Sequence, residues 1–309
     1  EEMARSVISR NTSPDLSFDR SINPYRGCEH GCIYCFARPS HAFLGLSPGL
    51  DFETKLIARP NAAAQLRKEL SHPRYDPKII AIGTNTDPYQ PIEKGREIMR
   101  EVLQVLSDFN HPVGIVTKGT LIERDIDILA PMAAKGLVRI GISITTLDPK
   151  TSRAMEPRVP MPAARLRTIR RLTDAGIPVR VMVSPVVPAL TDHELENILR
   201  AAKAAGAVAA SSIVLRLPRE VATLFRDWLA EHYPDRAARV MGRVRELHGG
   251  KDYDPDFGRR MVGQGAWAAM MQQRFKLATR QLELDRTLPA LRTDLFARPA
   301  QPGDQLSMF

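Results

Sequence analysis

The chain has 309 residues, of which 43% are hydrophobic and 26% charged, proportions typical of a folded globular protein rather than a disordered one. Lys and Arg outnumber Asp and Glu by 44 to 35, and the resulting net charge of +9 favours polyanions or acidic proteins as partners. The longest uncharged apolar run, residues 204–215, is shorter than a membrane-spanning helix, and no leader precedes it, so we expect a cytoplasmic protein without membrane contact.

All three cysteines, Cys28, Cys32 and Cys35, follow a strand predicted at residues 21–25. Three thiolates on one tight loop can hold three corners of a cubane iron-sulfur cluster and leave the fourth iron without a protein ligand. An odd number of closely spaced cysteines fits no disulfide framework and favours a reducing compartment. A structural zinc site with His30 as fourth ligand is the alternative, although such sites usually join two separated ligand pairs.

Strand-like and helical stretches alternate from residue 78 onward. Apolar residues at helical spacing predict a helix over 93–109. Capping-box patterns at Thr120 and Thr191 predict two helix starts. Glycines 136, 176 and 206 predict three helix ends. Further strands are predicted at 79–83, 113–117, 138–144, 179–184 and 212–215.

About six strands joined by short crossovers predict a parallel sheet, two strands short of a closed eight-stranded barrel. We therefore expect an α/β fold, a partial (β/α)6 TIM-type barrel with a helical C-terminal extension. The expected boundaries are an N-terminal extension at 1–20, the barrel at 21–217, the helical extension at 218–284 and a flexible tail at 285–309. Parallel strands bind ligands at their C-terminal ends, which places the cysteine loop at the mouth of the barrel.

The cysteine spacing, with Tyr34 before the last cysteine, resembles the radical S-adenosylmethionine superfamily, and residues 22–280 are similar to its spore photoproduct lyase family. The resemblance implies a [4Fe-4S] cluster on the three cysteines. It also implies that S-adenosylmethionine binds the open iron and is reductively cleaved to a 5′-deoxyadenosyl radical. By the same resemblance the cosubstrate is held by Thr86, Asp87, Lys118 and Ser143.

These four polar residues also have ordinary structural interpretations. Thr86 and Asp87 precede a proline and suit a turn. Lys118 beside Gly119 suits a solvated position, and Ser143 suits a core hydroxyl bonded to backbone. In favour of binding, they end or interrupt apolar strands at the edge where ligands bind.

Two positions depart from the lyase family. Thr84 stands where the family places a hydrogen-donating cysteine, and Phe36 where it places a relay tyrosine. Neither side chain can return a hydrogen atom, so we do not expect dimer reversal by the family's route, and no catalytic residue is assigned.

We expect a nucleic acid substrate, and a flavodoxin or ferredoxin as electron donor to a basic surface with arginines grouped at 165–171 and 236–245. A radical enzyme acting on a small molecule or protein, and a non-catalytic nucleic acid-binding protein stabilised by a metal, are the alternatives.

The last five residues resemble the peptide by which bacterial repair proteins bind the DNA sliding clamp. Two apolar anchors and a glutamine after a Pro-Gly pair suit insertion into a hydrophobic pocket. An ordinary frayed terminus is the alternative. The residues concerned are Gln305, Leu306, Ser307, Met308 and Phe309.

Overall fold

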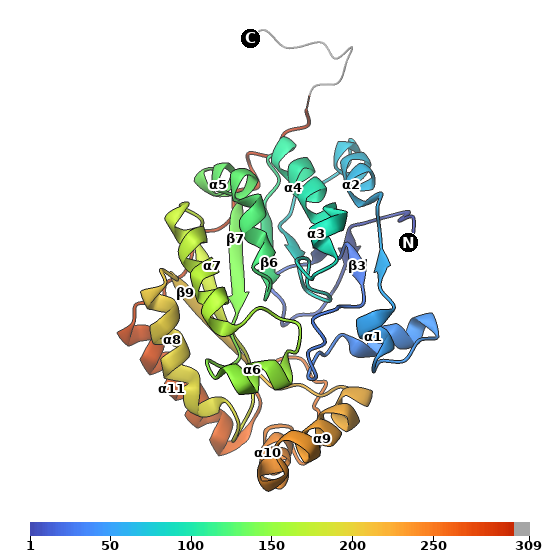
Figure 1. The fold of residues 1–309 in the computed structure, drawn as a ribbon. Coiled ribbons are helices and arrows are strands. Elements are labelled where there is room, and N and C mark those ends of the chain that lie inside the picture. The colour runs from blue at the N-terminus through green and yellow to red at the C-terminus, as the bar shows by residue number, and fades with distance from the viewer. Residues whose placement is uncertain (300–309) are drawn as a thin grey trace.

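The computed structural model describes residues 1–299, so the predicted clamp peptide lies outside the described residues. Its main sheet has seven strands in the order β1-β2-β5-β6-β7-β8-β9. The six from β2 to β9 are parallel neighbours, and β1 is an antiparallel edge. The partial (β/α)6 barrel is thereby confirmed (Figure 1). The strands are β1 Ser9–Arg10, β2 Arg20–Ile22, β5 Ile80–Ile82, β6 Val113–Thr117, β7 Val138–Ser143, β8 Val179–Val186 and β9 Ala209–Val214, with β3 Tyr25–Arg26 and β4 Ile57–Ala58 forming a separate pair.

Helices follow the outside of the sheet, and three more lie beyond the last strand (Figure 1). The helix predicted over 93–109 is interrupted at Glu97, whose φ of 53° lies in the left-handed region. The helices are α1 Asp51–Thr54, α2 Ala62–Ser71, α3 Glu93–Arg96, α4 Ile98–Asp108, α5 Ile126–Ala134, α6 Pro149–Met155, α7 Pro162–Asp174, α8 Leu195–Ala204, α9 Glu220–His232, α10 Pro234–Leu247 and α11 Gly265–Gln281, with short 3₁₀ helices at Arg38–Leu44, Leu121–Asp125 and Asp192–Glu194.

The helix starts predicted at Thr120 and Thr191 are confirmed, because both residues occupy N-cap positions, but the capping-box hydrogen bonds are not formed among residues 1–299. Both segments start as 3₁₀ turns, and in the described chain neither threonine side chain caps its helix. Glu123 instead accepts a hydrogen bond from Thr168, and Glu194 accepts one from the backbone N–H of Leu147 at 2.7 Å. Donors on neighbouring elements, invisible to a local pattern, satisfy these carboxylates. The three predicted helix-ending glycines do have positive φ.

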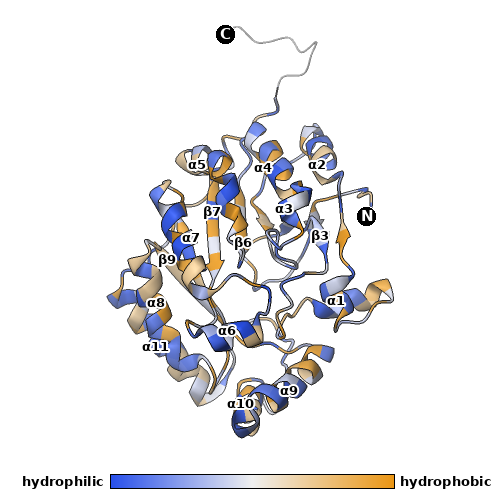
Figure 2. Ribbon diagram, in the orientation of Figure 1, coloured by the Kyte–Doolittle hydropathy of each residue, from blue (hydrophilic) through white to orange (hydrophobic). Residues whose placement is uncertain are grey.

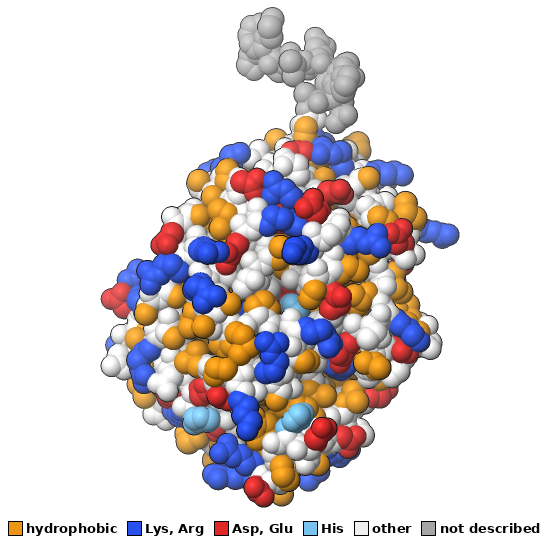
Figure 3. All heavy atoms as spheres, viewed as in Figure 1, with side chains coloured by type: hydrophobic (Ala, Val, Ile, Leu, Met, Phe, Trp, Pro, Cys, Tyr) orange, Lys and Arg blue, Asp and Glu red, His pale blue; other side chains and the backbone are white. Residues whose placement is uncertain are grey.

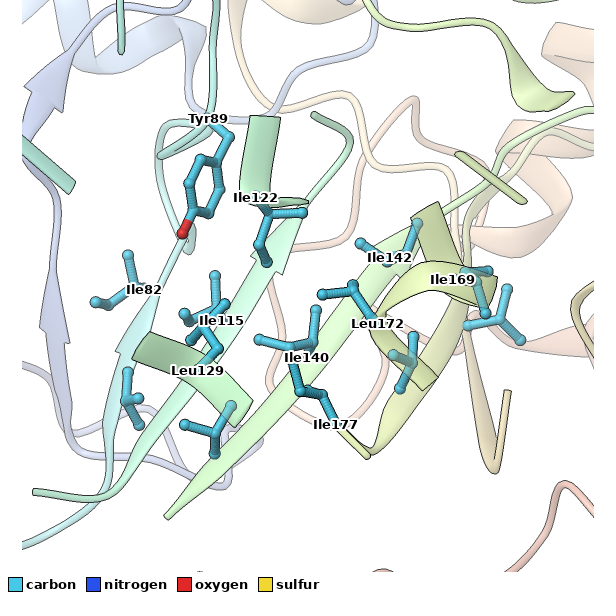
Figure 4. Packing of buried hydrophobic residues seen from close by; sticks show 14 of the residues in the cluster. Ile82, Tyr89, Ile115, Ile122, Leu129, Ile140, Ile142, Ile169, Leu172 and Ile177 are labelled. Atoms are coloured by element: carbon cyan, nitrogen blue, oxygen red, sulfur yellow. The ribbon is translucent and has the colours of Figure 1, made fainter. Parts of the chain in front are cut away.

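The hydrophobic core lies between the sheet and the helices. Successive strand residues point to opposite faces, and one face of the sheet is strongly apolar. Figure 4 shows Ile82, Ile115 and Ile140 of three neighbouring strands packed with Leu129 of α5 and Leu172 of α7. In Figure 2, β6 and β7 are mainly hydrophobic, whereas α7 and α8 carry residues of both kinds, as expected of helices that cover a sheet.

The opposite face of the strands forms the inside of the barrel and is less apolar. Val116, Ser143 and Met182 alternate with the core residues and line an interior cavity. Gly83, just after β5, has φ +85°, and a Cβ there would lie 1.9 Å from the carbonyl oxygen of Val116. Only glycine therefore allows the chain to turn at this strand end.

Residues 285–299, which the sequence places in a flexible tail, lie against the barrel. The backbone N–H of Arg292 donates to Gly136 O at 3.1 Å, and that of Ala297 donates to Phe109 O at 3.0 Å. The ring of Phe296 packs against those of Tyr75 and Phe109. Across residues 1–299, no helix has the length and apolar character required to cross a membrane.

Candidate functional site

The three cysteines lie on the loop between β3 and the first 3₁₀ helix, past the C-terminal end of β2. Arg38, which is 1% exposed, organises this loop. Its guanidinium donates to the carbonyl oxygens of Cys32 at 3.0 Å, Gly31 at 3.1 Å and Gly49 at 2.9 Å. Glu53, 2.5 Å away, balances its charge. Sequence reasoning missed Arg38, although an arginine three residues after the last cysteine was visible.

The side chains of Cys28 and Cys32 are buried, and that of Cys35 is partly exposed. Burial, followed by the charges of Asp87 and of the other two cysteines, raises the pKa of Cys28, while a hydrogen bond from the backbone N–H of Asp87 opposes the shift. Burial raises the pKa of Cys32 to about 12. Metal binding must therefore displace the protons, as iron does when it takes thiolate ligands.

The geometry does not favour the zinc alternative. Nδ1 of His30 lies 3.4 Å from Oδ2 of Asp87, a contact that histidine ligands of zinc also make through their second nitrogen, so it does not decide between the two sites. Within residues 1–299, no three His, Cys, Asp or Glu side chains converge closely enough to hold one metal ion. A cubane binds each thiolate to a different iron, so its ligands stand farther apart than those of a single ion. The donor set fits the cluster.

Asp87 joins the cysteine loop to the end of β6. Its carboxylate accepts hydrogen bonds from Thr117 Oγ1 at 2.6 Å, from the backbone N–H of Lys118 at 2.7 Å and from that of Tyr89 at 2.9 Å. Burial opposes ionisation, but His30 and these donors outweigh it and lower the pKa of Asp87 to about 2. The ionised carboxylate of Asp87 therefore links the segment after β5 to the C-terminal end of β6.

Thr86 is also committed to the fold. It is buried, and its hydroxyl donates to Tyr25 O at 3.0 Å. Lys118 and Ser143, by contrast, line a cavity of about 300 Å³ together with Cys32, Cys35 and Tyr34. Of the four residues predicted to bind the cosubstrate, Lys118 and Ser143 line the cavity. Thr86 and Asp87 instead form hydrogen bonds that stabilise the neighbouring loop.

Lys118 and Ser143 both offer polar groups to this cavity. Ser143 Oγ donates to Ser184 O at 2.9 Å, which leaves its oxygen free to accept. Burial lowers the pKa of Lys118, but Cys32, Glu156 and Asp87 outweigh it, and the net shift is upward. The side chain therefore carries a positive charge beside Cys32, suited to a carboxylate or phosphate ligand.

A buried polar network that sequence reasoning missed lies beneath the cavity. Arg165 Nη2 is 2.6 Å from Glu156 Oε2, and both side chains are fully buried. Glu156 also accepts hydrogen bonds from Tyr34 Oη and from Thr145 Oγ1. Arg165 Nη1 donates to Ser143 O at 2.8 Å.

Arg165 lies in the protein interior and not on the basic surface where the sequence predicts it. Arg165 was expected on a basic surface, but α7 buries it because its helical position faces the sheet. Glu156 lies beneath Tyr34 with its charge balanced, so it supports the cysteine loop from below.

Two comparisons with known sequences cover most of the barrel. The family described as the Radical SAM superfamily matches residues 22–202, more than half of the chain. An uncharacterised protein of Mycobacterium tuberculosis is 39% identical over 265 residues, which cover 85% of this chain and 77% of the relative. An uncharacterised protein of Methanocaldococcus jannaschii is 25% identical over 173 residues, which cover 56% and 62%.

Solved structures show the same fold. A spore photoproduct lyase mutant matches with a TM-score of 0.64 at 15% identity, covering 91% of this chain and 78% of the lyase. Another mutant, with bound AdoMet and dinucleoside spore photoproduct, gives 0.61 at 15%, covering 88% and 76%. The chain therefore belongs to the radical S-adenosylmethionine superfamily and is an enzyme whose cofactors are a [4Fe-4S] cluster and S-adenosylmethionine.

Proposed function

We propose that this radical S-adenosylmethionine enzyme acts on nucleic acid. One observation carries the proposal: the cavity that borders two cluster cysteines also contains Lys118 and, at its opening, Phe36 and Arg216. Aromatic rings and arginines are the side chains that stack on bases and bind phosphates. The net charge of +9 agrees with a polyanionic substrate. The lyase of the same fold has been solved with a dinucleoside bound.

The residues divide the work as follows. Cys28, Cys32 and Cys35 hold the cluster, while Lys118 and Ser143 hold the polar ends of the cosubstrate. Thr86 and Asp87 position the strand ends behind them through the contacts with Tyr25 and Thr117. When bound, the cluster and S-adenosylmethionine supply reductive cleavage and hydrogen abstraction from the substrate. The largely apolar cavity excludes water from that chemistry.

The outcome of the reaction should differ from thymine-dimer reversal. Thr84 and Phe36 both line the cavity. The resemblance to the lyase family implies a donor cysteine and a relay tyrosine at these two positions. A hydroxyl O–H and a phenyl ring are poor hydrogen-atom donors. The substrate radical must therefore be quenched by another group or rearrange to product without that donor.

The basic surface is consistent with nucleic acid and with an acidic electron donor, a flavodoxin or ferredoxin. On the face in Figure 3, Lys and Arg side chains are spread widely with acidic ones among them. Arg171, for example, pairs with Glu123, and Arg245 pairs with Asp252 at 2.9 Å. On this face the basic side chains therefore do not form one continuous patch that would attract nucleic acid nonspecifically. The residues of the cavity support a nucleic acid substrate more strongly than the surface charge does.

Formation of 5′-deoxyadenosine tests the substrate class. The anaerobically reconstituted enzyme is incubated with dithionite and S-adenosylmethionine, alone or with duplex, single-stranded or damaged DNA, or with RNA. We expect at least one nucleic acid to raise the rate above the substrate-free level. Cys32→Ser, which removes one iron ligand, should abolish the product in every sample. A rate that no nucleic acid changes, but that a peptide or metabolite fraction raises, would move the function to the small-molecule or protein alternative.

A further inference from the structure

An arginine and an aromatic ring form a pair at the opening of the cavity. Arg216 follows β9, and Phe36 follows the last cluster cysteine. The guanidinium carbon of Arg216 lies 4.3 Å from the centroid of the Phe36 ring. Both side chains line the cavity, and Phe36 is 45% exposed. The pair therefore stands where the cavity meets solvent.

The charge of Arg216 is not matched by a neighbouring carboxylate. Within residues 1–299 it forms no ion pair and no hydrogen bond. The acidic groups that act on it include Tyr253 and Asp15, and the cation Arg260 acts on it as well. Both carboxylate oxygens of Asp15 are taken by Arg260, each at 2.7 Å. The thiol of Cys35 also acts on Arg216, more weakly than Asp15 does.

The guanidinium of Arg216 is partly buried and has no carboxylate partner among residues 1–299, so an anion can take that place. Stacking on Phe36 fixes the plane of the group and leaves its N–H edge available, and that edge matches a phosphate bidentately. Apolar side chains that suit a base, Phe18, Ile213 and Met261, line the cavity beside it. A nucleotide presents both kinds of group, a phosphate and a base.

We propose that Arg216, held by Phe36, binds a backbone phosphate of the nucleic acid and so brings a nucleotide of a single strand to the opening of the cavity, next to the bound cosubstrate. The inference rests on the proposed function, and it names Arg216 as the residue that recognises the nucleic acid backbone. Arg216 selects a phosphodiester next to the reacting nucleotide, and duplex must open or flip that nucleotide before it can enter.

Salt-dependent binding tests this assignment independently of turnover. Anaerobic fluorescence anisotropy with a labelled single-stranded oligonucleotide compares the reconstituted wild type with Arg216→Gln, Arg216→Lys and Arg167→Gln. We expect Arg216→Gln to weaken binding about 10- to 100-fold and to reduce the slope of log K against log salt by about 0.7. Arg216→Lys should keep the slope but bind less tightly, because it cannot form the bidentate contact.

Arg167→Gln is the matched control, since Arg167 is exposed on α7 and should change affinity less than about 2-fold. Iron content and circular dichroism show whether each variant is intact. If the wild type binds oligonucleotide but Arg216→Gln keeps its affinity and slope, this inference is wrong and the proposed function stands. If the wild type neither binds nucleic acid nor responds to it in the 5′-deoxyadenosine assay, both are wrong.

Discussion

Replacing Arg165 by methionine should destabilise the protein by about 3–5 kcal/mol. The substitution keeps most of the side-chain volume, so the loss comes from the buried carboxylate of Glu156, which would lose the stronger of the two cations, Arg165 and Lys118, that stabilise its charge. The carbonyl oxygen of Ser143 and the hydroxyl of Ser152 also lose their donor. Urea unfolding of the anaerobic protein, followed by circular dichroism, measures the free energy of unfolding.

The pH dependence of this loss identifies its cause. In the wild type the pKa of Glu156 is lowered, so its contribution is present above the unfolded pKa and is lost as pH falls through the folded pKa. In Arg165→Met, burial without Arg165 should raise that pKa, and the penalty should be relieved as Glu156 takes up a proton. The difference between the proteins should therefore be larger at about pH 8 than at about pH 5.

Arg171→Met is the matched control on the same helix. Arg171 also pairs with a glutamate, Glu123, but its side chain is 63% exposed, so the change should cost less than about 1 kcal/mol. The double variant Glu156→Gln with Arg165→Met should regain part of the loss, because it leaves no buried charge. If Arg165→Met cost no more than Arg171→Met, or lost equal stability at both pH values, the buried ion pair would not be what holds this region together.

Three further outcomes are expected. Cys32→Ser should lose the thiolate-to-iron absorbance and most of the bound iron after reconstitution, whereas Thr84→Ser should keep both. Ser143→Ala should raise the KM for S-adenosylmethionine about 10-fold while the iron content is unchanged, because one hydrogen bond to the cosubstrate is lost; an unchanged KM would exclude Ser143 from that site. A peptide of residues 301–309 should bind a bacterial sliding clamp saturably in surface plasmon resonance, and Leu306→Ala with Phe309→Ala should remove the signal; a flat trace for the native peptide would exclude this partner.

Local patterns were sufficient where a short segment carries the information. The spacing of Cys28, Cys32 and Cys35 indicates the cluster and the superfamily because the ligands lie on one loop. Strand-helix alternation predicts the parallel sheet because each repeat must bury an apolar face. The strand ends were less accurate: β2 stops at Ile22 and β9 begins at Ala209, since register depends on neighbouring strands.

Side-chain partners far apart in the chain could not be predicted in this way. Arginines 165 and 171 look alike in a helix sequence, yet one is fully buried against Glu156 and the other lies at the surface. Asp87 and Lys118 appear as separate candidates, and only the adjacent ends of β5 and β6 show that one orients the backbone of the other.

The sequence by itself determined the cofactor chemistry and the barrel, because both arise from motifs and periodicities contained within a few tens of residues. The tertiary structure alone decided which candidates face the cavity and which charges are balanced. That distinction depends on side chains brought together by the sheet, as with Phe36 and Arg216, which are 180 residues apart and meet at one opening.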